Sequence, residues 1–505
     1  MNIVTEGPPT CRRLIVNPEL ASLRDMARHD ERTTEYGSPS YVTKFRSRGA
    51  ADTRNTVDGE VTPEDLATIG RVKEYLESQE LIQIDRQIGT EAGFGSLHCR
   101  LFITRPFARL GLMFHESLAP TRDPGSDPAF VTIDVPEWPG GRSIIVDPVE
   151  GTTYVLGTDY YGEIKKSFLR QTMYRAKHHG QLGLHAGSKV VRCRSARDGE
   201  LKESGILFFG LSGTGKTSLT CHSYDLDLAA GELVRVRQDD VVVLSRRGFC
   251  KGTEGKGFYI KTDGLNPKDQ AALFQAAISA RAIFENVWVD EHGRVDFDNE
   301  ELTTNGRAVV PIEAVLNTDD KIDVDHVTHV FFITRNPLVP AVCRLDDRQA
   351  AVAFMLGESI KTSAADPSAR GEPVRSVGTN PFIVGSRGEE GRIFHEILSA
   401  NPDMHTFLLN TGKIGEGASA RKITLAETVA IIRAILREAV DWAPDAATGL
   451  EVPAGAPDLD DALFRLADHY DAPTLAERLA ELRAARKAWL EGFPDFPAEL
   501  AAAVY

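Results

Sequence analysis

The sequence contains little cysteine and no long apolar run. Its six cysteines lie far apart without a C-x-x-C pair, which argues against a disulfide framework and a structural zinc site. The longest apolar runs, such as Ile206–Phe209, have strand length, far below the roughly 20 residues that cross a membrane. The first residues, Met1–Glu6, show no basic stretch followed by an apolar one, so we expect no secretory signal. These absences predict a reducing, cytoplasmic setting and no membrane partner.

Positive charge is scarce as well. The chain has 58 Lys and Arg against 73 Asp and Glu, a formal net charge of -15 at pH 7. This charge repels polyanions, which excludes a non-specific binder of nucleic acid. With 42% hydrophobic and 26% charged residues among 505, the composition predicts a globular protein of two or three domains. A local cluster of cations is informative against this background, because it can still bind a small anion.

Short patterns predict secondary structure. Residues 62–78, 423–438 and 475–490 have helical periodicity, and 101–104, 143–146 and 330–333 are β-rich or apolar runs of strand length. Thr62 followed by Pro63 predicts a helix start. We expect the first 60 residues to be irregular, and the domains to be 1–195 on the substrate side, 196–440 for nucleotide and metal, and 441–505 as a helical tail packed on the core.

One segment fits the phosphate-loop pattern G-x-x-x-x-G-K-[ST]. It consists of Gly210, Leu211, Ser212, Gly213, Thr214, Gly215, Lys216 and Thr217. The preceding Gly205–Phe209 has the pattern of a buried strand, and Thr217 can start a helix. The glycines let backbone N–H groups turn toward phosphate oxygens, while Lys216 reaches the β- and γ-phosphates and the Thr217 hydroxyl coordinates Mg²⁺. The segment therefore predicts nucleotide binding.

A strand that ends in two acids follows this loop. Glu232–Gln238 alternates polar and apolar residues and leads into Asp239 and Asp240. An acid pair at a strand end usually forms a turn, but shortly after a phosphate loop it is the expected metal-linked carboxylate.

The amino-acid sequence around the loop resembles that of one enzyme family. The matching segments are, in chain order, Tyr160–Phe168, Leu184–Ser188, Phe208–Thr217, Asp239–Asp240, Tyr259–Thr262, Glu285–Val287, Thr304–Arg307, Leu409–Gly412 and Lys422–Thr428. Together they resemble the ATP-type phosphoenolpyruvate carboxykinases over roughly residues 95 to 440. The resemblance implies a two-domain α/β fold with a P-loop nucleotide-binding C-terminal domain, a helical C-terminal tail and an active site in the cleft between the domains.

The resemblance also implies metal ligands. Lys166, His185 and Asp240 would hold Mn²⁺, and Thr217 would bind a second ion, Mg²⁺ or Mn²⁺, that bridges the β- and γ-phosphates. A mixed nitrogen and oxygen ligand set suits Mn²⁺ better than a Ca²⁺ cage. A lysine ligand must be neutral, and a nearby dication can enforce this by lowering its pKa.

Further roles follow from the same resemblance. The residues implied to bind substrate are Arg48, Tyr160, Ser212 and Arg307; those implied to act in catalysis are Lys166, Lys216, Lys261 and Arg307; and Lys422 and Thr428 would lie at the nucleotide base. The reaction implied is conversion of oxaloacetate and ATP to phosphoenolpyruvate, ADP and CO₂, a step of gluconeogenesis and anaplerosis.

Several of these residues have ordinary alternatives. Lys165–Lys166 can be a solvated surface pair, His185 a core or surface histidine, and Tyr160 a packing residue. Arg307 can pair with Glu300 or Glu301.

Among the places where the chain departs from the family, two concern the substrate and the base. Arg48 lies in a poor match to the family's N-terminal arginine run, and Arg54 is a rival for its role. Thr334–Leu338 replaces the usual adenine-side wording. These departures bear on recognition of the substrate and the base, not on phosphoryl chemistry.

Two other functions stay open. A P-loop kinase on this fold would phosphorylate a small-molecule or protein hydroxyl, with His185 or Asp239 as general base. A non-catalytic nucleotide-binding regulator would not need the full metal set. The choice among ATP, GTP and pyrophosphate, the physiological direction, allosteric effectors and the oligomeric state also stay open, a monomer being compatible with the sequence.

Overall fold

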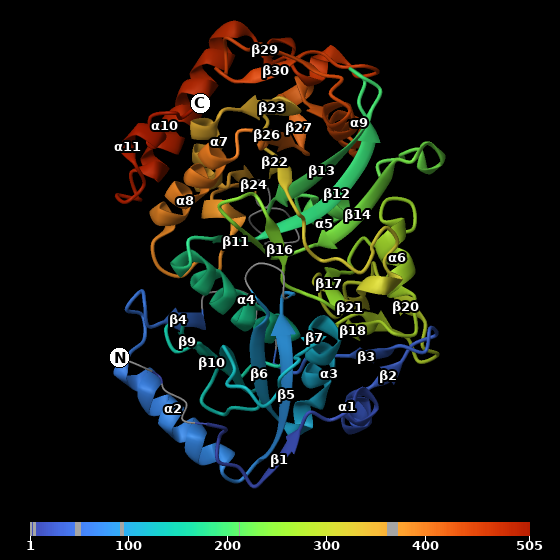
Figure 1. The fold of residues 1–505 in the computed structure, drawn as a ribbon, viewed down its shortest axis with the longest axis vertical. Helices are drawn as coiled ribbons and strands as arrows, with labels where there is room; N and C mark the ends of the chain where they lie inside the picture. The colour runs from blue at the N-terminus through green and yellow to red at the C-terminus, as the bar shows by residue number, and fades with distance from the viewer. Residues whose placement is uncertain (1–2, 4–6, 46–51, 91–94, 212, 361–371) are drawn as a thin grey trace. The chain divides into compact units, whose positions relative to one another are not determined.

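The computed structural model describes residues 3, 7–45, 52–90, 95–211, 213–360 and 372–505, which form two compact units (Figure 1). The first unit comprises Met1–His178, Gly252–Leu316 and Phe382–Gly385, and the second comprises His179–Lys251, Asn317–Pro381 and Ser386–Tyr505. The division of the chain at residues 195 and 440 stays a prediction about domains. The compact units divide the chain differently, because strands from 252–316 pair with strands from the N-terminal segment.

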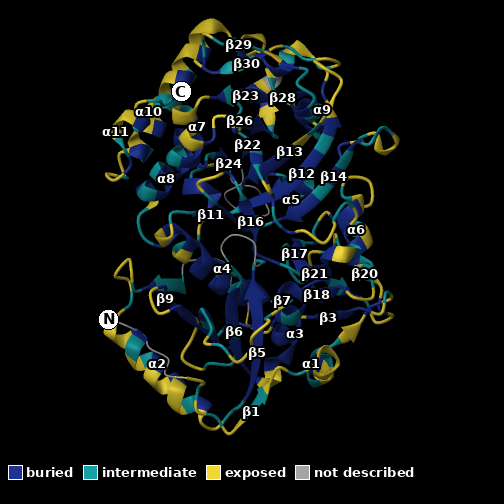
Figure 2. Ribbon diagram, viewed as in Figure 1, coloured by how far each residue is buried: buried dark blue, intermediate teal, exposed yellow. Residues whose placement is uncertain are grey.

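A mixed sheet is the base of the first unit. Its strand order is β1 (Arg13–Val16), β5 (Glu80–Ile88), β6 (Leu97–Thr104), β8 (Phe130–Val135), β10 (Thr152–Leu156), β9 (Ser143–Asp147) and β4 (Thr53–Asn55), with β7 (Ala119–Pro120) paired to β5. Strands β6, β8 and β10 run parallel, whereas β5 and β9 pair antiparallel with β6 and β10. Strands β6, β9 and β10 are almost wholly buried (Figure 2).

A second sheet of this unit carries several predicted site residues. Its order is β17 (Gly257–Lys261), β21 (Arg307–Pro311), β18 (Ile283–Glu285), β3 (Pro39–Tyr41) and β2 (Arg32–Thr33), and β19 (Trp288–Val289) and β20 (Val295–Asp296) form a separate ribbon. The helices of the unit are α1 (Leu20–Ala27), α2 (Pro63–Leu76), α3 (Ala108–Ser117), α4 (Tyr161–His178) and α6 (Ala271–Ala277). Helix α4 packs against β8, and α3 packs against α4 and β21.

The second unit is built on another large sheet. Its order is β14 (Leu233–Gln238), β12 (Ala186–Arg194), β13 (Leu201–Phe209), β22 (Val327–Thr334), β26 (His405–Asn410), β23 (Val342–Leu345), β30 (Glu451–Gly455) and β29 (Asp441–Pro444). Strands β13, β22 and β26 are parallel. Phe208, Phe331 and Phe407 stack across these strands, with ring centroids 5.2 and 5.0 Å apart, and form the centre of the core.

Small sheets and helices complete the second unit. The sheets pair β11 (Leu182–Leu184), β15 (Val242–Leu244) and β16 (Cys250–Gly252); β24 (Ser359–Ile360) and β25 (Pro373–Val374); and β27 (Lys413–Ile414) and β28 (Arg421–Lys422). The helices are α5 (Lys216–Cys221), α7 (Asp347–Leu356), α8 (Arg387–Ala400), α9 (Leu425–Leu436), α10 (Ala472–Leu490) and α11 (Ala498–Ala501).

The predicted helices and strands are largely confirmed. Helix α2 begins after a capping box in which the Thr62 side chain accepts from Asp65 N and the Asp65 side chain accepts from Thr62 N. A second capping box at Thr424 starts α9, and α10 covers the predicted 475–490. No helix among the described residues is long and apolar enough to span a membrane. All six cysteines are free thiols, as their spacing predicted.

Two expectations are wrong. The first 60 residues are not irregular, because 13–16, 20–27, 32–33, 39–41 and 53–55 form β1, α1, β2, β3 and β4. The tail is not helical throughout, because residues 441–455 contain β29 and β30, which extend the large sheet. The ring centroids of Trp442 of β29 and Phe407 lie 5.6 Å apart. Packing of this aromatic ring on the sheet favours a strand here more than the Ala-rich composition of the tail favours a helix.

Candidate functional site

The phosphate loop joins β13 to α5, which confirms the predicted strand–loop–helix context. Gly213 and Gly215 have φ of 78° and 102°, a region that favours glycine. The loop turns tightly, because Thr214 N and Oγ1 both donate to Leu211 O, at 3.1 and 2.7 Å. A Cβ on Gly210 would lie 2.6 Å from Thr214 Oγ1. The glycines are therefore required by the shape of the loop, which is suited to phosphate.

Three side chains of the second unit meet beside this loop. The Asp240 Oδ1 atom lies 3.0 Å from His185 Nε2 and 3.6 Å from Lys216 Nζ. The side chains of His185 and Asp240 are each 15% exposed. Asp240 follows the end of β14, and His185 lies between β11 and β12, which pairs with β14. Sheet pairing thus brings together three residues that are up to 55 positions apart in the sequence.

The hydrogen bonding of His185 suits a metal ligand. Its Nδ1 lies 2.7 Å from the carbonyl oxygen of Thr379, which can only accept, so Nδ1 carries a proton. In a neutral ring Nε2 then offers a lone pair toward the Asp240 carboxylate. Two arrangements satisfy this pair: an imidazolium that donates to Asp240, or a cation bound by both His185 and Asp240. A backbone carbonyl that accepts from the second ring nitrogen is typical of metal-bound histidine.

The predicted metal ligands are divided between the units. His185 and Asp240 belong to the second unit and Lys166 to the first. Among the described residues, no three or more His, Cys, Asp or Glu side chains are grouped to hold a metal ion. The predicted set contains only two residues of these types, because its other members are a lysine and a threonine.

The two lysines at the start of α4 are not a solvated surface pair. The side chain of Lys165 is 3% exposed and its Nζ lies 2.9 Å from Glu254 Oε2. Lys166 is partly buried, with its Nζ 4.6 Å from the centre of the Phe382 ring. The surface alternative is therefore wrong. Sequence reasoning missed Glu254, which stands outside every recognised motif.

Two cations lie opposite each other on neighbouring strands of the second sheet of the first unit. Lys261 of β17 and Arg307 of β21 are direct partners in the antiparallel register. Like charges at such positions repel, and a bound anion relieves the repulsion. Lys261 Nζ also lies 2.5 Å from Asp263 Oδ2, and the Arg307 guanidinium lies 5.6 Å from the centre of the Tyr259 ring. This pair is a candidate anion site.

Tyr160 belongs to the same group. Its hydroxyl accepts a hydrogen bond of 3.2 Å from Asn305 Nδ2, and Asn305 Oδ1 accepts from Arg307 Nη2 at 2.8 Å. Arg307 is thus held by Asn305, and of its two predicted alternative partners Glu301 accepts from Trp288 Nε1 at 3.0 Å. The sequence suggested Tyr160 and Arg307, but not the residue that joins them.

The remaining candidates lie elsewhere. Arg48 and Ser212 fall outside the described residues. Arg54, the rival to Arg48, donates to Asp65 Oδ1 at 2.6 Å and has a structural partner.

The two predicted base-side residues differ in exposure. Lys422 is exposed on β28. Thr428 is buried in α9, where its hydroxyl donates to Thr424 O at 3.0 Å.

Comparison with known proteins places the chain among relatives. The sequence model of a family described as phosphoenolpyruvate carboxykinase matches residues 13–462. The phosphoenolpyruvate carboxykinase (ATP) of Aeropyrum pernix is 36% identical over 391 residues, covering 77% of this chain and 76% of that protein. A protein of Trypanosoma cruzi with the same name, further described as glycosomal, is 29% identical over 467 residues, 85% of this chain and 93% of its own. Phosphoenolpyruvate carboxykinase (ATP) 1 of Salinibacter ruber is 29% identical over 462 residues, 86% of this chain and 81% of its own.

Proposed function

This chain belongs to the phosphoenolpyruvate carboxykinase (ATP) family, and on that premise we propose that it converts oxaloacetate and ATP to phosphoenolpyruvate, ADP and carbon dioxide. The observation that carries the proposal is the approach of Lys216, His185 and Asp240 beside a glycine-shaped phosphate loop. A phosphate-binding loop and a pair of possible metal ligands thus lie in one place. The reaction breaks the bond to the departing carboxylate, and the enolate oxygen left behind attacks the γ-phosphorus and displaces ADP.

The proposed metal ligands are Lys166, His185 and Asp240 for Mn²⁺, with the Thr217 hydroxyl for a second ion, Mg²⁺ or Mn²⁺. The 3.0 Å approach of His185 Nε2 to Asp240 Oδ1 supports this assignment, since a cation shared by the two atoms would satisfy both. A divalent cation bound here would offset the negative charge of the enolate and of the phosphoryl group. Thr379 fixes the His185 tautomer through its carbonyl, so that Nε2 stays available.

The cations of both units have separate tasks in this proposal. Lys216 and Lys261 spread the charge on the transferred phosphoryl group, which lowers the cost of charge movement in the transition state. Arg307 and Tyr160 orient the carboxylates of oxaloacetate, Arg307 through its planar donor pair.

Arg48 and Ser212 are proposed as further contacts of the substrate, and Lys422 and Thr428 as contacts of the base. We place the reaction in the cytoplasm.

Metal binding provides a test that does not depend on turnover. Titration of Mn²⁺ into the protein, followed by electron paramagnetic resonance, is expected to show a site that His185→Ala and Asp240→Asn each weaken by about tenfold or more. The matched control is His292→Ala, whose side chain is 71% exposed. Unchanged Mn²⁺ affinity in both site variants would refute the ligand assignment and leave the pair as an imidazolium–carboxylate contact.

A further inference from the structure

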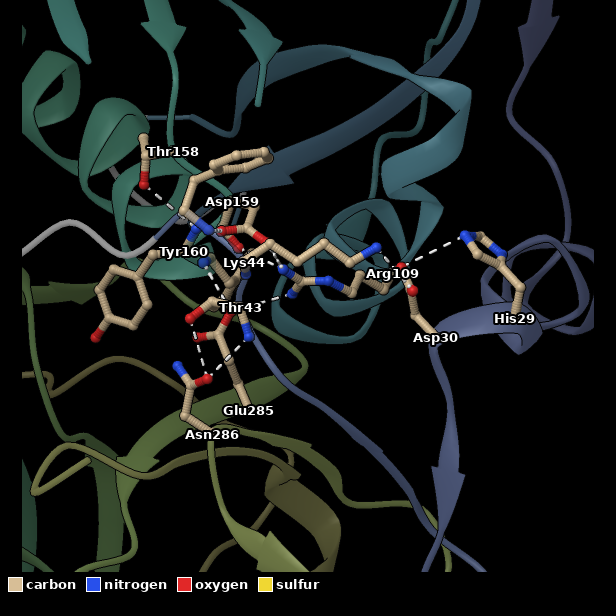
Figure 3. A network of polar contacts seen from close by, with 12 residues as sticks. His29, Asp30, Thr43, Lys44, Arg109, Thr158, Asp159, Tyr160, Glu285 and Asn286 are labelled. Carbon is tan, nitrogen blue, oxygen red and sulfur yellow. Dashed lines mark hydrogen bonds and ion pairs between the residues drawn. The ribbon is translucent and has the colours of Figure 1, made fainter. Parts of the chain in front are cut away.

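A buried carboxylate, Glu285, connects three parts of the first unit (Figure 3). It ends β18, and its side chain is 0% exposed. Its Oε1 accepts from Tyr161 N at 2.9 Å and lies 3.4 Å from Arg109 Nη1, and its Oε2 accepts from the Tyr259 hydroxyl at 2.5 Å. Burial raises the pKa of Glu285, against the opposing effects of Arg109 and these hydrogen bonds. One side chain thus joins α3, the first residue of α4 and β17.

Arg109 extends this contact to a second carboxylate. Its guanidinium is 2% exposed, and Nη2 donates to both the side chain and the carbonyl oxygen of Asp159 at 2.7 Å. The Asp159 carboxylate also accepts from the backbone N–H groups of Lys44 and Phe45, each at 2.7 Å. Next to Glu285, Asn286 Oδ1 accepts from Thr43 N at 2.9 Å. Residues 43–45, 159 and 285–286 are therefore locked to one another although they are far apart in the sequence.

These contacts surround the proposed substrate residues of the same unit. Tyr160 lies between Asp159 and Tyr161, both of which are fixed by the network. On the opposite side, Glu285 and Arg307 are partners in the register of β18 and β21.

The path closes through hydrogen bonds already described, from Arg307 through Asn305 to the Tyr160 hydroxyl. Tyr160 and Arg307 are thus held from both ends.

A buried network of charges is not the most stable way to fill a core. Two carboxylates and one guanidinium are buried together, and well-packed apolar groups of similar volume are often as stable or more so. A buried charge network does, however, fix one geometry where several apolar packings would do. The network binds both chain neighbours of Tyr160 and includes the register partner of Arg307, which indicates where that geometry is needed.

We propose that Glu285, through Tyr161, Tyr259 and Arg109, is a positioning residue that sets the alignment of Tyr160 and Arg307 toward the carboxylates of oxaloacetate. This inference rests on the proposed function and assigns a role to the Glu285–Val287 segment. Glu285 does not touch the reacting atoms. Its effect is on the geometry of residues that do, and a displacement of about 1 Å at such residues costs up to about a hundredfold in rate.

The test is steady-state kinetics of phosphoenolpyruvate formation by the full chain, with oxaloacetate and ATP varied separately. Glu285→Gln keeps the shape but places an amide where Arg109 or Tyr259 needs an acceptor. We expect kcat/KM for oxaloacetate to fall by about ten- to a hundredfold, and the Kd for ATP, measured by calorimetry, to change by less than about twofold. Tyr259→Phe removes one hydroxyl and is expected to cause a smaller loss of the same kind. The control is Glu313→Gln, at a carboxylate that is 57% exposed.

Each outcome decides the matter. Loss confined to oxaloacetate supports the positioning role. Equal losses for oxaloacetate and ATP that follow the loss of folded protein would show a merely structural role and overturn it, as would unchanged kinetics in a folded Glu285→Gln protein. If Glu285→Gln does not fold, Tyr259→Phe decides by the same criteria. Absence of phosphoenolpyruvate formation by the wild-type chain would overturn the proposed function itself, which separates that failure from failure of this inference.

Discussion

Replacement of Lys189 by methionine is predicted to change how the stability of the second unit depends on pH. Lys189, on β12, is fully buried, and its Nζ donates to Leu219 O at 3.0 Å and His222 O at 2.7 Å, at the end of the short helix that begins with Lys216. The Nζ also lies 3.8 Å from the centre of the Tyr224 ring. Burial lowers the pKa of Lys189 to about 7.

The direction of the effect follows from proton linkage. In the unfolded chain the pKa of a lysine is about 10.4, so below pH 7 Lys189 is charged in both states and its burial opposes folding by roughly 4 to 5 kcal/mol. Above pH 7 the folded state releases the proton while the unfolded state keeps it, and this penalty falls as the pH rises toward 10. Between pH 7 and 9 the wild-type chain therefore gains roughly 2 kcal/mol relative to a chain without the amine.

Urea unfolding of wild type and Lys189→Met at pH 7, 8 and 9, followed by tryptophan fluorescence, measures this difference. Cys221 is present in both chains, so the ionisation of its thiol cancels in the difference between them, and burial raises its pKa to about 12 in the folded state. The matched control is Lys487→Met, at an exposed position of α10 in the same unit. If the difference in unfolding free energy between wild type and Lys189→Met is the same at all three pH values, the reasoning is refuted. The Lys189 ammonium would then stay charged in the folded chain, stabilised by the two backbone carbonyls and the Tyr224 ring that it contacts.

Three further predictions concern the loop, the tail and the substrate. Gly215→Ala is expected to weaken ATP binding at least about tenfold, because a φ of 102° is unfavourable for alanine. In the calorimetric titration Gly199→Ala controls for backbone strain, since Gly199 has a φ of 75° and a Cβ added there would meet no atom within 4 Å. Burial raises the pKa of Glu358, but the charges of Arg486 and Arg375 outweigh burial and hold this pKa at about 2. Arg486→Met removes one of these two cations and should therefore lower the unfolding free energy by about 3 to 5 kcal/mol at pH 7. That loss should shrink as the pH falls toward 2, because without Arg486 the Glu358 carboxylate takes up a proton at a higher pH than in the wild-type chain, and a constant loss would contradict the assignment. Arg307→Lys should raise KM for oxaloacetate about tenfold or more without changing the Kd for ATP, since lysine cannot replace a planar donor pair, and equal effects on both ligands would contradict the role.

Local patterns predicted the elements that carry the phosphate chemistry. The glycine spacing of 210–217 and the apolar run before it determine a strand, a loop and a helix over neighbouring residues, and α2 and α9 begin at caps that are visible in the sequence. The meeting of His185 with Asp240 was suggested by family resemblance alone, because only the pairing of β12 with β14 brings them together.

What could not be predicted depends on pairing between distant segments. The strands of 252–316 join β2 and β3 in one sheet, and nothing local in either segment specifies this partner. The Glu285–Arg109–Asp159 contacts were missed for the same reason, since an arginine inside an apolar helix gives no sign of its two carboxylates. Residues 441–455 were predicted to belong to a helical tail. Their strands could not be recognised in the sequence, because they are stabilised by the sheet edge that they join rather than by their own propensity.

The central claim is tested most directly by a coupled assay of the purified chain with oxaloacetate, ATP, Mg²⁺ and Mn²⁺. Phosphoenolpyruvate should form with the wild-type chain and with His292→Ala, and should disappear with Lys166→Ala and with His185→Ala, which would establish the reaction and the metal site together. No phosphoenolpyruvate with any nucleotide, while ATP binding is intact, would contradict the account and favour a kinase with another acceptor.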